Sequence, residues 1–251
     1  MASTLHPALT VAEPYLIQQD YAAYTPEQQD IWRELVSRRM PQLREHACQE
    51  YLVGFEQIGL RADSIPNLAE VNERLEPLTG WNATPVSGFL PPDAFFEMLA
   101  ARRFPTTTWL RSRESMEYTP EPDIFHDVLG HVPMHAHPVF ADFLQQYGKV
   151  CATVMGDKDK LERMGRLFWF TVEFGVIRQD GGIKLYGSGL ISSHGESRYV
   201  IEGGPEIRDF NLEQVLNQEF KVSEMQKVLY AVDSFDQIYE AAKEAEARLC
   251  H

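Results

Sequence analysis

The sequence predicts a single, mainly α-helical domain with a few small β-strands, an α+β fold. Amphipathic segments with helix-capping residues recur from residue 25 onward, whereas stretches rich in β-branched residues are few and short. No internal repeat, no parallel βαβ succession and no GxGxxG or GK[ST] loop is recognisable. The 251 residues, 44% hydrophobic and 24% charged, are enough to bury a core without disulfides.

The first helices are predicted from their capping residues. After an irregular lead-in over residues 1–24, Thr25 is expected to cap a helix that has Pro26 in its first position. Gln28 would complete a capping box with Thr25. Pro41 is expected to open a second helix, because proline is tolerated in the first turn but not inside a helix.

The middle and the end of the chain alternate between short extended pieces and helices. Residues 79–104 predict an extended piece, a Gly/Pro turn and a helix from about Asp93, and residues 106–112 (TTTWLRS) predict a strand. The remaining predicted elements are a helix from Pro138 to Gly148, a helix over 160–175 closed by Gly175, a hairpin or short strands over 181–193, and an amphipathic helix over 233–250.

The charge and the cysteines exclude several classes of protein. A formal net charge of −14 disfavours binding to nucleic acid or to an anionic membrane, and no apolar run is long enough for a membrane span. Cys48, Cys151 and Cys250 are odd in number and far apart, which predicts free thiols in a reducing compartment. The N-terminus lacks the pattern of a signal peptide, so we expect a cytoplasmic enzyme.

Four of the eight histidines lie within residues 126–137 (HDVLGHVPMHAH). On a regular helix, His126 and His131 would point about 140° apart, so five residues is the wrong spacing for two ligands there. We expect Gly130 to end the helix in a left-handed conformation and Pro133 to prevent its continuation, so that His131 turns back beside His126. The spacing also differs from the HExxH pattern of zinc proteases.

The other two histidines of this segment have a simpler interpretation. His135 and His137 flank Ala136 and could bind a metal from one side of an extended segment. A solvated loop, with His137 at the cap before Pro138, is the favoured alternative.

Glu173 is the third candidate ligand, because a carboxylate within the most apolar helix needs a partner or a metal. The alternative is a salt bridge to Arg163, Arg166 or Arg178. With His126 and His131 it would form the facial triad of non-haem Fe(II) oxygenases, although the same ligands can hold catalytic zinc. Trp169 would share its helical face, and with Phe168 or Phe170 would form an aromatic wall suited to an aromatic substrate.

Three long motifs reveal a family resemblance. YTPEPDIFHDVLGHVP at 118–133, FWFTVEFG at 168–175 and YGSGLISS at 186–193 together resemble the pterin-dependent aromatic amino acid hydroxylases, in particular short bacterial members that act on phenylalanine. The similarity runs from about residue 25 to the C-terminus, so residues 25–251 would be the catalytic domain. It implies Fe(II), a tetrahydropterin (tetrahydrobiopterin or a bacterial analogue) and O2. No regulatory domain or tetramerisation helix is recognisable, which implies a monomer or a dimer.

The resemblance assigns His126, His131 and Glu173 as the iron ligands. It also matches a set of residues to the amino acid site, with Arg111 binding the substrate carboxylate and Trp169 packing on the substrate ring. The other residues matched to that site are Tyr118, Thr119, Pro122, Gly189, Ser192 and Ser193. A serine of the GLxSS turn would orient a ligand histidine by a hydrogen bond.

For the pterin, the resemblance matches PVSGFLPPDAFF at 85–96. Backbone hydrogen bonds, a stacking ring and an acid would come from Val86, Gly88, Phe89, Leu90, Phe95 and Asp127. Departures from the animal pattern include Asp127 in place of Glu, which would reach the pterin through water, and Phe168 in place of Tyr.

The expected reaction is hydroxylation of L-phenylalanine to L-tyrosine. Two alternatives stay open on the sequence. One is hydroxylation of tryptophan, of tyrosine or of the meta position of phenylalanine, and the other is hydrolysis by zinc on the same three ligands.

Overall fold

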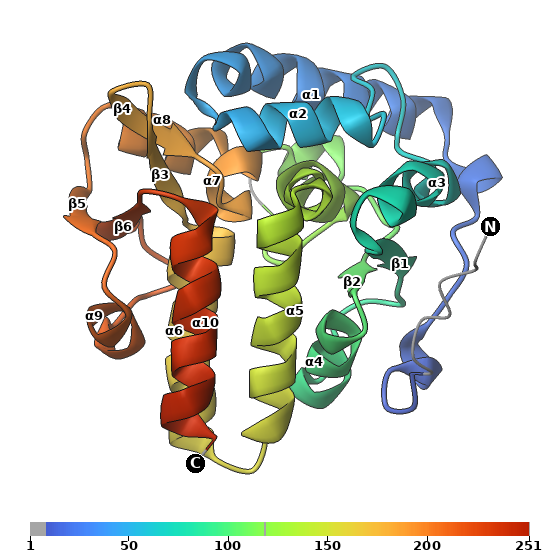
Figure 1. Cartoon of the computed structure of the whole chain (residues 1–251). Coiled ribbons are helices and arrows are strands. Elements are labelled where there is room, and N and C mark those ends of the chain that lie inside the picture. The colour runs from blue at the N-terminus through green and yellow to red at the C-terminus, as the bar shows by residue number, and fades with distance from the viewer. Residues whose placement is uncertain (1–8, 118, 251) are drawn as a thin grey trace.

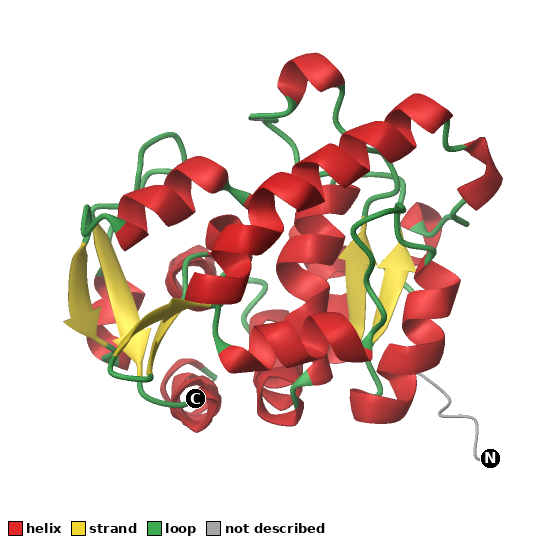
Figure 2. Cartoon of the chain, turned by 90° about the horizontal axis from the view of Figure 1, so that it is seen from above, coloured by secondary structure: helices red, strands yellow, loops and turns green. Residues whose placement is uncertain are grey.

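The computed structural model describes residues 9–117 and 119–250, which form one mainly helical unit with two small sheets (Figures 1 and 2). The helices are α1 Pro26–His46, α2 Gln49–Gln57, α3 Leu68–Thr79, α4 Pro92–Ala100, α5 Pro138–Thr153, α6 Lys158–Phe168, α7 Ser188–Ser192, α8 His194–Ile201, α9 Leu212–Asn217 and α10 Phe235–Leu249. The strands are β1 Asn82–Pro85, β2 Arg103–Thr106, β3 Val176–Gln179, β4 Gly182–Leu185, β5 Glu206–Asp209 and β6 Val228–Val232. The predicted fold class is confirmed.

The two sheets lie on opposite sides of the helices (Figure 2). One is the parallel pair β1–β2, and the other is mixed, with the order β4-β3-β6-β5. The prediction that no parallel βαβ unit exists was wrong, because β1, α4 and β2 form one, in which Asn82 pairs with Arg103. Strands of four residues are too short to produce a recognisable apolar run, which explains the error.

The start of the domain follows the predicted capping box. The Thr25 side chain accepts from the Gln28 amide, and the Gln28 side chain accepts from the Thr25 amide. The predicted break at Pro41 was wrong, because α1 continues through it to His46 and α2 begins only at Gln49. Pro41 and Ser37, whose carbonyl loses its helical donor, are both exposed, so water can satisfy that carbonyl.

The central helix α5 is longer than predicted. It passes through Gly148 and ends at Thr153, so the prediction of a helix end at Gly148 was wrong. A Cβ at Gly148 would lie 2.6 Å from the backbone nitrogen of Ala100 and 2.7 Å from the Cβ of Leu99. Gly148 therefore allows α4 to approach α5 closely. The predicted C-terminal helix is confirmed as α10, which packs along α5 (Figure 1).

Residues 106–112 do not form the predicted strand beyond Thr106, where β2 ends. Their backbone groups bond instead to the segment that carries the histidines. The amides of Thr107 and Arg111 donate to the carboxylates of Asp127 and Asp123, and the Ile124 amide donates to the Trp109 carbonyl. These bonds replace a sheet ladder and hold the two segments together.

Residues 181–193 are strand only in their first half. β4 is the one strand within this range, and it forms an antiparallel hairpin with β3, which precedes the range; Ser188–Ser192 is the short helix α7, so a hairpin within 181–193 was wrong. This helix lies next to both segments that carry candidate metal ligands.

The described part of the lead-in, residues 9–24, contains two 3₁₀ turns, Glu13–Tyr15 and Tyr21–Ala23. The Glu97 carboxylate on α4 accepts from the amides of Thr10, Val11 and Ala12, at 2.8 to 3.0 Å. The domain boundary at residue 25 stays a prediction. In the described part of the chain, none of the helices has the length and apolar character that a membrane crossing needs.

Candidate functional site

Two π-helical segments carry the three candidate metal ligands. Phe125–His131 holds both histidines, and Trp169–Glu173 follows directly on α6. The predicted end of a helix at Gly130 was wrong, because Gly130 lies inside the first π segment and has no positive φ. A π-helix bonds each amide to the carbonyl five residues earlier, so residues five apart lie on one face. This geometry, and not a turn, brings His126 and His131 together.

The second segment also differs from the predicted continuous α-helix over 160–175. The α-helical part ends at Phe168, and the Phe174 amide donates to the Trp169 carbonyl five residues earlier at 2.8 Å. Glu173 thereby ends the π segment beside the histidines.

The donor atoms of His126, His131 and Glu173 all lie within 4.8 Å of one another. The two histidine Nε2 atoms are 3.2 Å apart, and Glu173 carboxylate oxygens lie 3.2 Å from His131 Nε2 and 3.8 Å from His126 Nε2. Bonds of about 2.1 Å at right angles to one ion would put donors about 3 Å apart. The three side chains therefore fit a shared metal ion.

The alternative of an arginine partner for Glu173 is wrong. The side chains of Arg163, Arg166 and Arg178 form ion pairs with Asp159, with Glu219, and with Asp209 and Asp233, respectively.

Two serine hydroxyls of α7 hold two of the ligands. Ser192 Oγ lies 2.9 Å from His126 Nδ1, which leaves Nε2 directed at the other donors. Ser188 Oγ donates to Glu173 Oε2 at 2.8 Å. The sequence analysis assigned Ser192 but missed Ser188. The four-residue spacing between the two serines would have pointed to a shared face only if the segment had been read as a helix.

Burial and charge set the protonation of the ligands. Burial lowers the pKa of His126 to about 4, against the opposing attraction of Glu173, so the imidazole is neutral at pH 7. Burial alone would raise the pKa of Glu173, but the electrostatic attraction of the two histidines and hydrogen bonds from His131 and Ser188 outweigh it and lower that pKa to about 2. A neutral imidazole and a carboxylate are the forms that bind metal.

An apolar cavity of about 380 Å³ adjoins the three ligands. All six residues matched to the pterin site line this cavity: Val86, Gly88, Phe89, Leu90, Phe95 and Asp127. The sequence analysis missed several others that line it: Phe96, Phe104, Pro105, Thr107, Trp109, Tyr147 and Gly165. Apart from Phe96, which ends the matched segment 85–96, these residues come from three separate stretches of chain without a common motif, so only the fold reveals them.

Asp127 lines this cavity, and its carboxyl group is already hydrogen-bonded. Its Oδ2 accepts from the Thr107 amide at 2.8 Å and from Thr107 Oγ1 at 2.7 Å. Burial raises the pKa of Asp127 to about 7, although both bonds from Thr107 oppose that rise.

Arg111 is buried and bound to a carboxylate of the protein itself. Its Nε and Nη2 donate to the two oxygens of Asp123 at 2.8 and 2.7 Å. Asp123 also accepts from the His126 amide at 3.1 Å. The guanidinium is therefore held in one orientation beside the first π segment.

The other residues matched to the amino acid site are distributed around the ligands. Pro122 lines the cavity, Gly189 packs against the Glu173 carbonyl, and Ser193 caps α8. Thr119 donates to the Glu121 carbonyl, and Tyr118 lies outside the described residues. None of these contacts establishes a role in binding, so the roles stay predictions.

Of the three residues considered for the aromatic wall, Phe168 lines this cavity, and the predicted contact of Trp169 with the substrate ring stays a prediction. Phe168 lines the cavity and contacts Phe95 at 5.9 Å between ring centroids. Trp169 stacks on Phe220 and donates its indole N–H to Gln226, whereas Phe170 is buried in the core.

Of the two remaining histidines, only His137 matches a predicted alternative. His137 is half-buried and accepts from the Phe140 amide, so the predicted cap is confirmed. His135 is fully buried against Trp81, so a solvated loop was wrong for this residue. Neither belongs to the metal-binding cluster found among the described residues.

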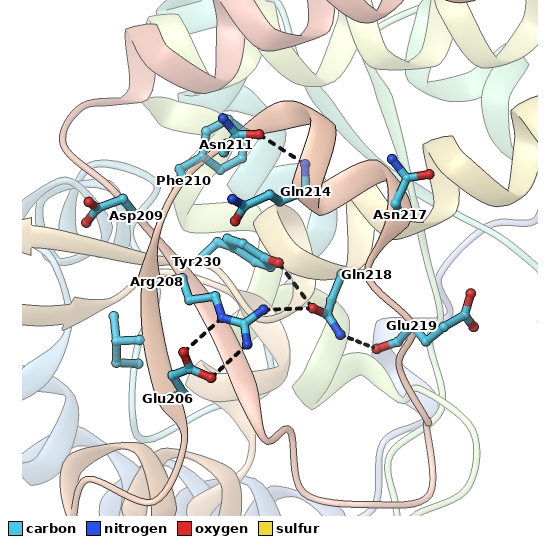
Figure 3. Close-up of a pocket in the computed structure, with 11 residues that line it drawn as sticks. Glu206, Arg208, Asp209, Phe210, Asn211, Gln214, Asn217, Gln218, Glu219 and Tyr230 are labelled. Carbon is cyan, nitrogen blue, oxygen red and sulfur yellow. Dashed lines mark hydrogen bonds and ion pairs between the residues drawn. The ribbon is translucent and has the colours of Figure 1, made fainter.

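A larger hollow of about 940 Å³ between β5 and α9 has none of the three candidate metal ligands (Figure 3). Arg208 donates to the Glu206 carboxylate and to the Gln218 side chain, which also accepts from Tyr230. These four side chains thus satisfy one another, and none of the three candidate ligands lines the hollow.

Comparison with known proteins agrees with this site. The sequence profile of the family described as biopterin-dependent aromatic amino acid hydroxylase matches residues 14–250. The phenylalanine-4-hydroxylase of Chromobacterium violaceum is 39% identical over 233 residues, covering 92% of this chain and 77% of that protein. That of Caulobacter vibrioides is 38% identical, covering 90% and 77%.

A solved structure also matches the whole fold. The crystal structure of the C. violaceum phenylalanine hydroxylase, with bound iron(III) and the oxidised cofactor 7,8-dihydrobiopterin, superposes with a TM-score of 0.89 at 38% identity. The match covers 95% of this chain and 87% of that one. The helical fold with a two-histidine, one-carboxylate centre defines a non-haem metalloenzyme. The chain belongs to the family of biopterin-dependent aromatic amino acid hydroxylases.

Proposed function

We propose that the chain is a monooxygenase that hydroxylates L-phenylalanine to L-tyrosine with Fe(II), a tetrahydropterin and O2. The observation that carries the proposal is the convergence of His126, His131 and Glu173 beside an aromatic cavity in a member of this family. The relatives named phenylalanine-4-hydroxylase support phenylalanine as the substrate, and the C. violaceum structure with iron and a pterin supports both cofactors.

The protein's part in this reaction begins at the metal ligands. Two histidines and a carboxylate suit Fe(II) because they leave coordination positions open. When bound, the iron and the reduced pterin supply the activation of O2, of which one oxygen atom enters the substrate ring. Ser192 and Ser188 hold the His126 ring and the Glu173 carboxylate in the orientation that binds the metal.

Arg111 is the residue that we assign to the substrate carboxylate. Asp123 holds its Nε and Nη2, whereas Nη1 makes only a long 3.4 Å bond to the Met116 carbonyl. Nη1 is therefore the atom best able to donate to a carboxylate. Fixing the amino acid end in this way would restrict which ring carbon faces the metal.

The cavity of about 380 Å³ is the proposed pterin site. Phe95 and Phe168 offer ring faces, and Val86, Gly88 and Leu90 offer backbone groups for the edge of a pterin. Asp127, held by Thr107, offers a carboxyl group at the same cavity. A cytoplasmic location and a monomeric or dimeric state stay predictions.

The proposal is tested by anaerobic loading with Fe(II), followed by turnover with L-phenylalanine, tetrahydrobiopterin and O2. We expect tyrosine that forms only when the pterin and O2 are both present. Glu173→Ala should lose both iron and tyrosine formation, whereas Glu219→Ala, which changes an exposed carboxylate paired with Arg166, should keep both. Iron and activity retained by Glu173→Ala would refute the assignment of the ligands.

Product analysis with the other aromatic amino acids tests the substrate. Tyrosine as the main product from phenylalanine supports the proposal, whereas preferred hydroxylation of tryptophan, tyrosine or the meta position would overturn this part of it. Hydrolysis by the zinc-loaded protein, without any dependence on pterin or O2, would overturn the oxygenase assignment.

A further inference from the structure

Arg39 is a buried cation without an acidic partner. Its side chain is 3% exposed, and none of the described carboxylates forms an ion pair with it. The guanidinium donates instead to two carbonyls of α7: Nε and Nη2 reach the Ile191 oxygen at 2.9 and 2.7 Å, and Nη2 reaches the Leu190 oxygen at 3.2 Å. Nη1 donates to the Gln42 side chain.

Burying a charged group costs free energy unless hydrogen bonds within the protein replace those it made to water. Burial lowers the pKa of Arg39 to about 10, so the group still carries its charge at neutral pH. Its bonds converge on the C-terminal turn of α7, where carbonyls lack helical donors and favour a cation. Arg39 thus connects the long helix α1 to the last turn of α7, 152 residues away in the chain.

α7 in turn connects to both π segments. Ser192 bonds His126, and Ser188 bonds Glu173. The backbones are also in close contact, because a Cβ at Gly187 would lie 2.5 Å from the Glu173 carbonyl oxygen. A shift of α7 would therefore move both hydroxyls relative to the ligands that they orient.

We propose that Arg39 is a positioning residue for the metal site, acting through α7 on His126 and Glu173. The inference rests on the proposed function, because it assumes that these side chains bind a metal. It predicts that the loss of Arg39 weakens metal binding by a route that includes the two serine hydroxyls. Removing partners that orient metal ligands lowers metal affinity by roughly 10- to 100-fold.

The test measures the affinity for Co(II), a probe whose visible absorption reports ligand geometry. In the full chain, Arg39→Met should raise the Co(II) dissociation constant by roughly 10-fold and change the absorption spectrum. Arg39→Lys should restore part of the affinity, because an ammonium group can still donate to carbonyls. Arg38→Met is the matched control: Arg38 precedes Arg39 on α1 but pairs with Glu34 and Glu117, so its loss should leave both readouts unchanged.

A mutant cycle separates positioning from general stability. In a Ser188→Ala/Ser192→Ala background, Arg39→Met should change the Co(II) dissociation constant by less than about twofold, since the coupling route is already cut. An undiminished effect in that background, or wild-type affinity in Arg39→Met, overturns the inference. If Arg39→Met does not fold, the Co(II) dissociation constants of Arg39→Gln and Arg39→Lys are compared in the same two backgrounds.

Failure of the proposed function gives a different result. A wild-type chain that binds neither Co(II) nor Fe(II) overturns the metal site, and the inference with it. A wild-type chain that binds metal and forms tyrosine, together with an Arg39→Met variant of equal affinity, overturns only the role of Arg39.

Discussion

His135 shows how strongly burial can shift the pKa of a single residue. Its ring stacks on Trp81, with centroids 4.7 Å apart, and lies 4.8 Å from Phe104. Neither ring nitrogen has a hydrogen-bond partner in the described part of the chain. Burial lowers the pKa of His135 well below its usual value, so the folded protein holds this imidazole neutral.

This residue should make the folded state sensitive to acid. The folded-state pKa lies below the unfolded value of about 6.5, so the unfolded chain binds the extra proton as the pH falls. Its contribution to stability is complete above that unfolded pKa. As the pH falls below that value, the contribution of His135 decreases by up to about 1.4 kcal/mol for each pH unit.

We predict that His135→Phe flattens the dependence of stability on pH between about pH 7 and pH 5. Phenylalanine can occupy the stack against Trp81 without a group that needs a hydrogen bond. The free energy of unfolding is measured by urea titration at several pH values, with a chelator present so that metal does not contribute. Equal slopes for the wild type and His135→Phe would contradict this account.

At the scale of elements, capping chemistry was predictable and π-helices were not. Thr25, Pro26 and Gln28 act within four residues, so the start of α1 can be read locally. The π segment at Phe125–His131 depends on contacts from elsewhere, including the bond from the Tyr51 hydroxyl to the Leu129 carbonyl and the bonds from residues 107 and 111. Sequence reasoning therefore brought together the three candidate ligands by motif but described the backbone between them wrongly.

The role of a glycine is likewise hard to predict from local sequence. Gly148 has the sequence appearance of a helix end, yet it lies inside α5 where α4 approaches. No local pattern distinguishes a glycine that ends a helix from one that allows close packing. In the candidate site, Ser188 was missed for a related reason, since its role depends on α7 being a helix.

These two kinds of glycine predict opposite effects of alanine. Gly148→Ala should destabilise the protein by about 1–3 kcal/mol, because the new Cβ would meet the backbone of Ala100 at 2.6 Å. Gly165→Ala in α6 should stabilise it by roughly 0.5–1 kcal/mol, because no atom from outside its own turn of helix lies within 4 Å of the new Cβ and alanine favours a helix.

Thermal and urea unfolding of both variants measure these changes. The pair is its own control, since each replaces glycine by alanine within a helix. Stabilisation by Gly148→Ala would show that α4 and α5 can separate without loss, which would contradict the close packing described here.

At the scale of the whole molecule, the metal site joins elements that are distant in the chain. Its candidate ligands come from Phe125–His131 and Trp169–Glu173; Ser188 and Ser192 of α7 bond to two of them, and Arg39 of α1 bonds to α7. A metal ion bound here would crosslink two segments that lie more than 40 residues apart. Within the protein, the donors are held by the attraction between Glu173 and the histidines and by the hydroxyls of Ser188 and Ser192.

We therefore predict that metal stabilises the entire fold and not only the site. Free Fe(II) at about 100 times its dissociation constant should raise the free energy of unfolding by about 2.7 kcal/mol, because the unfolded chain cannot assemble the three donors. Calorimetric scans with Fe(II) under anaerobic conditions and with a chelator measure the difference in Tm. His126→Ala should abolish the dependence on metal, whereas Glu219→Ala should retain it. A Tm that is the same with and without metal would mean that these donors do not share an ion.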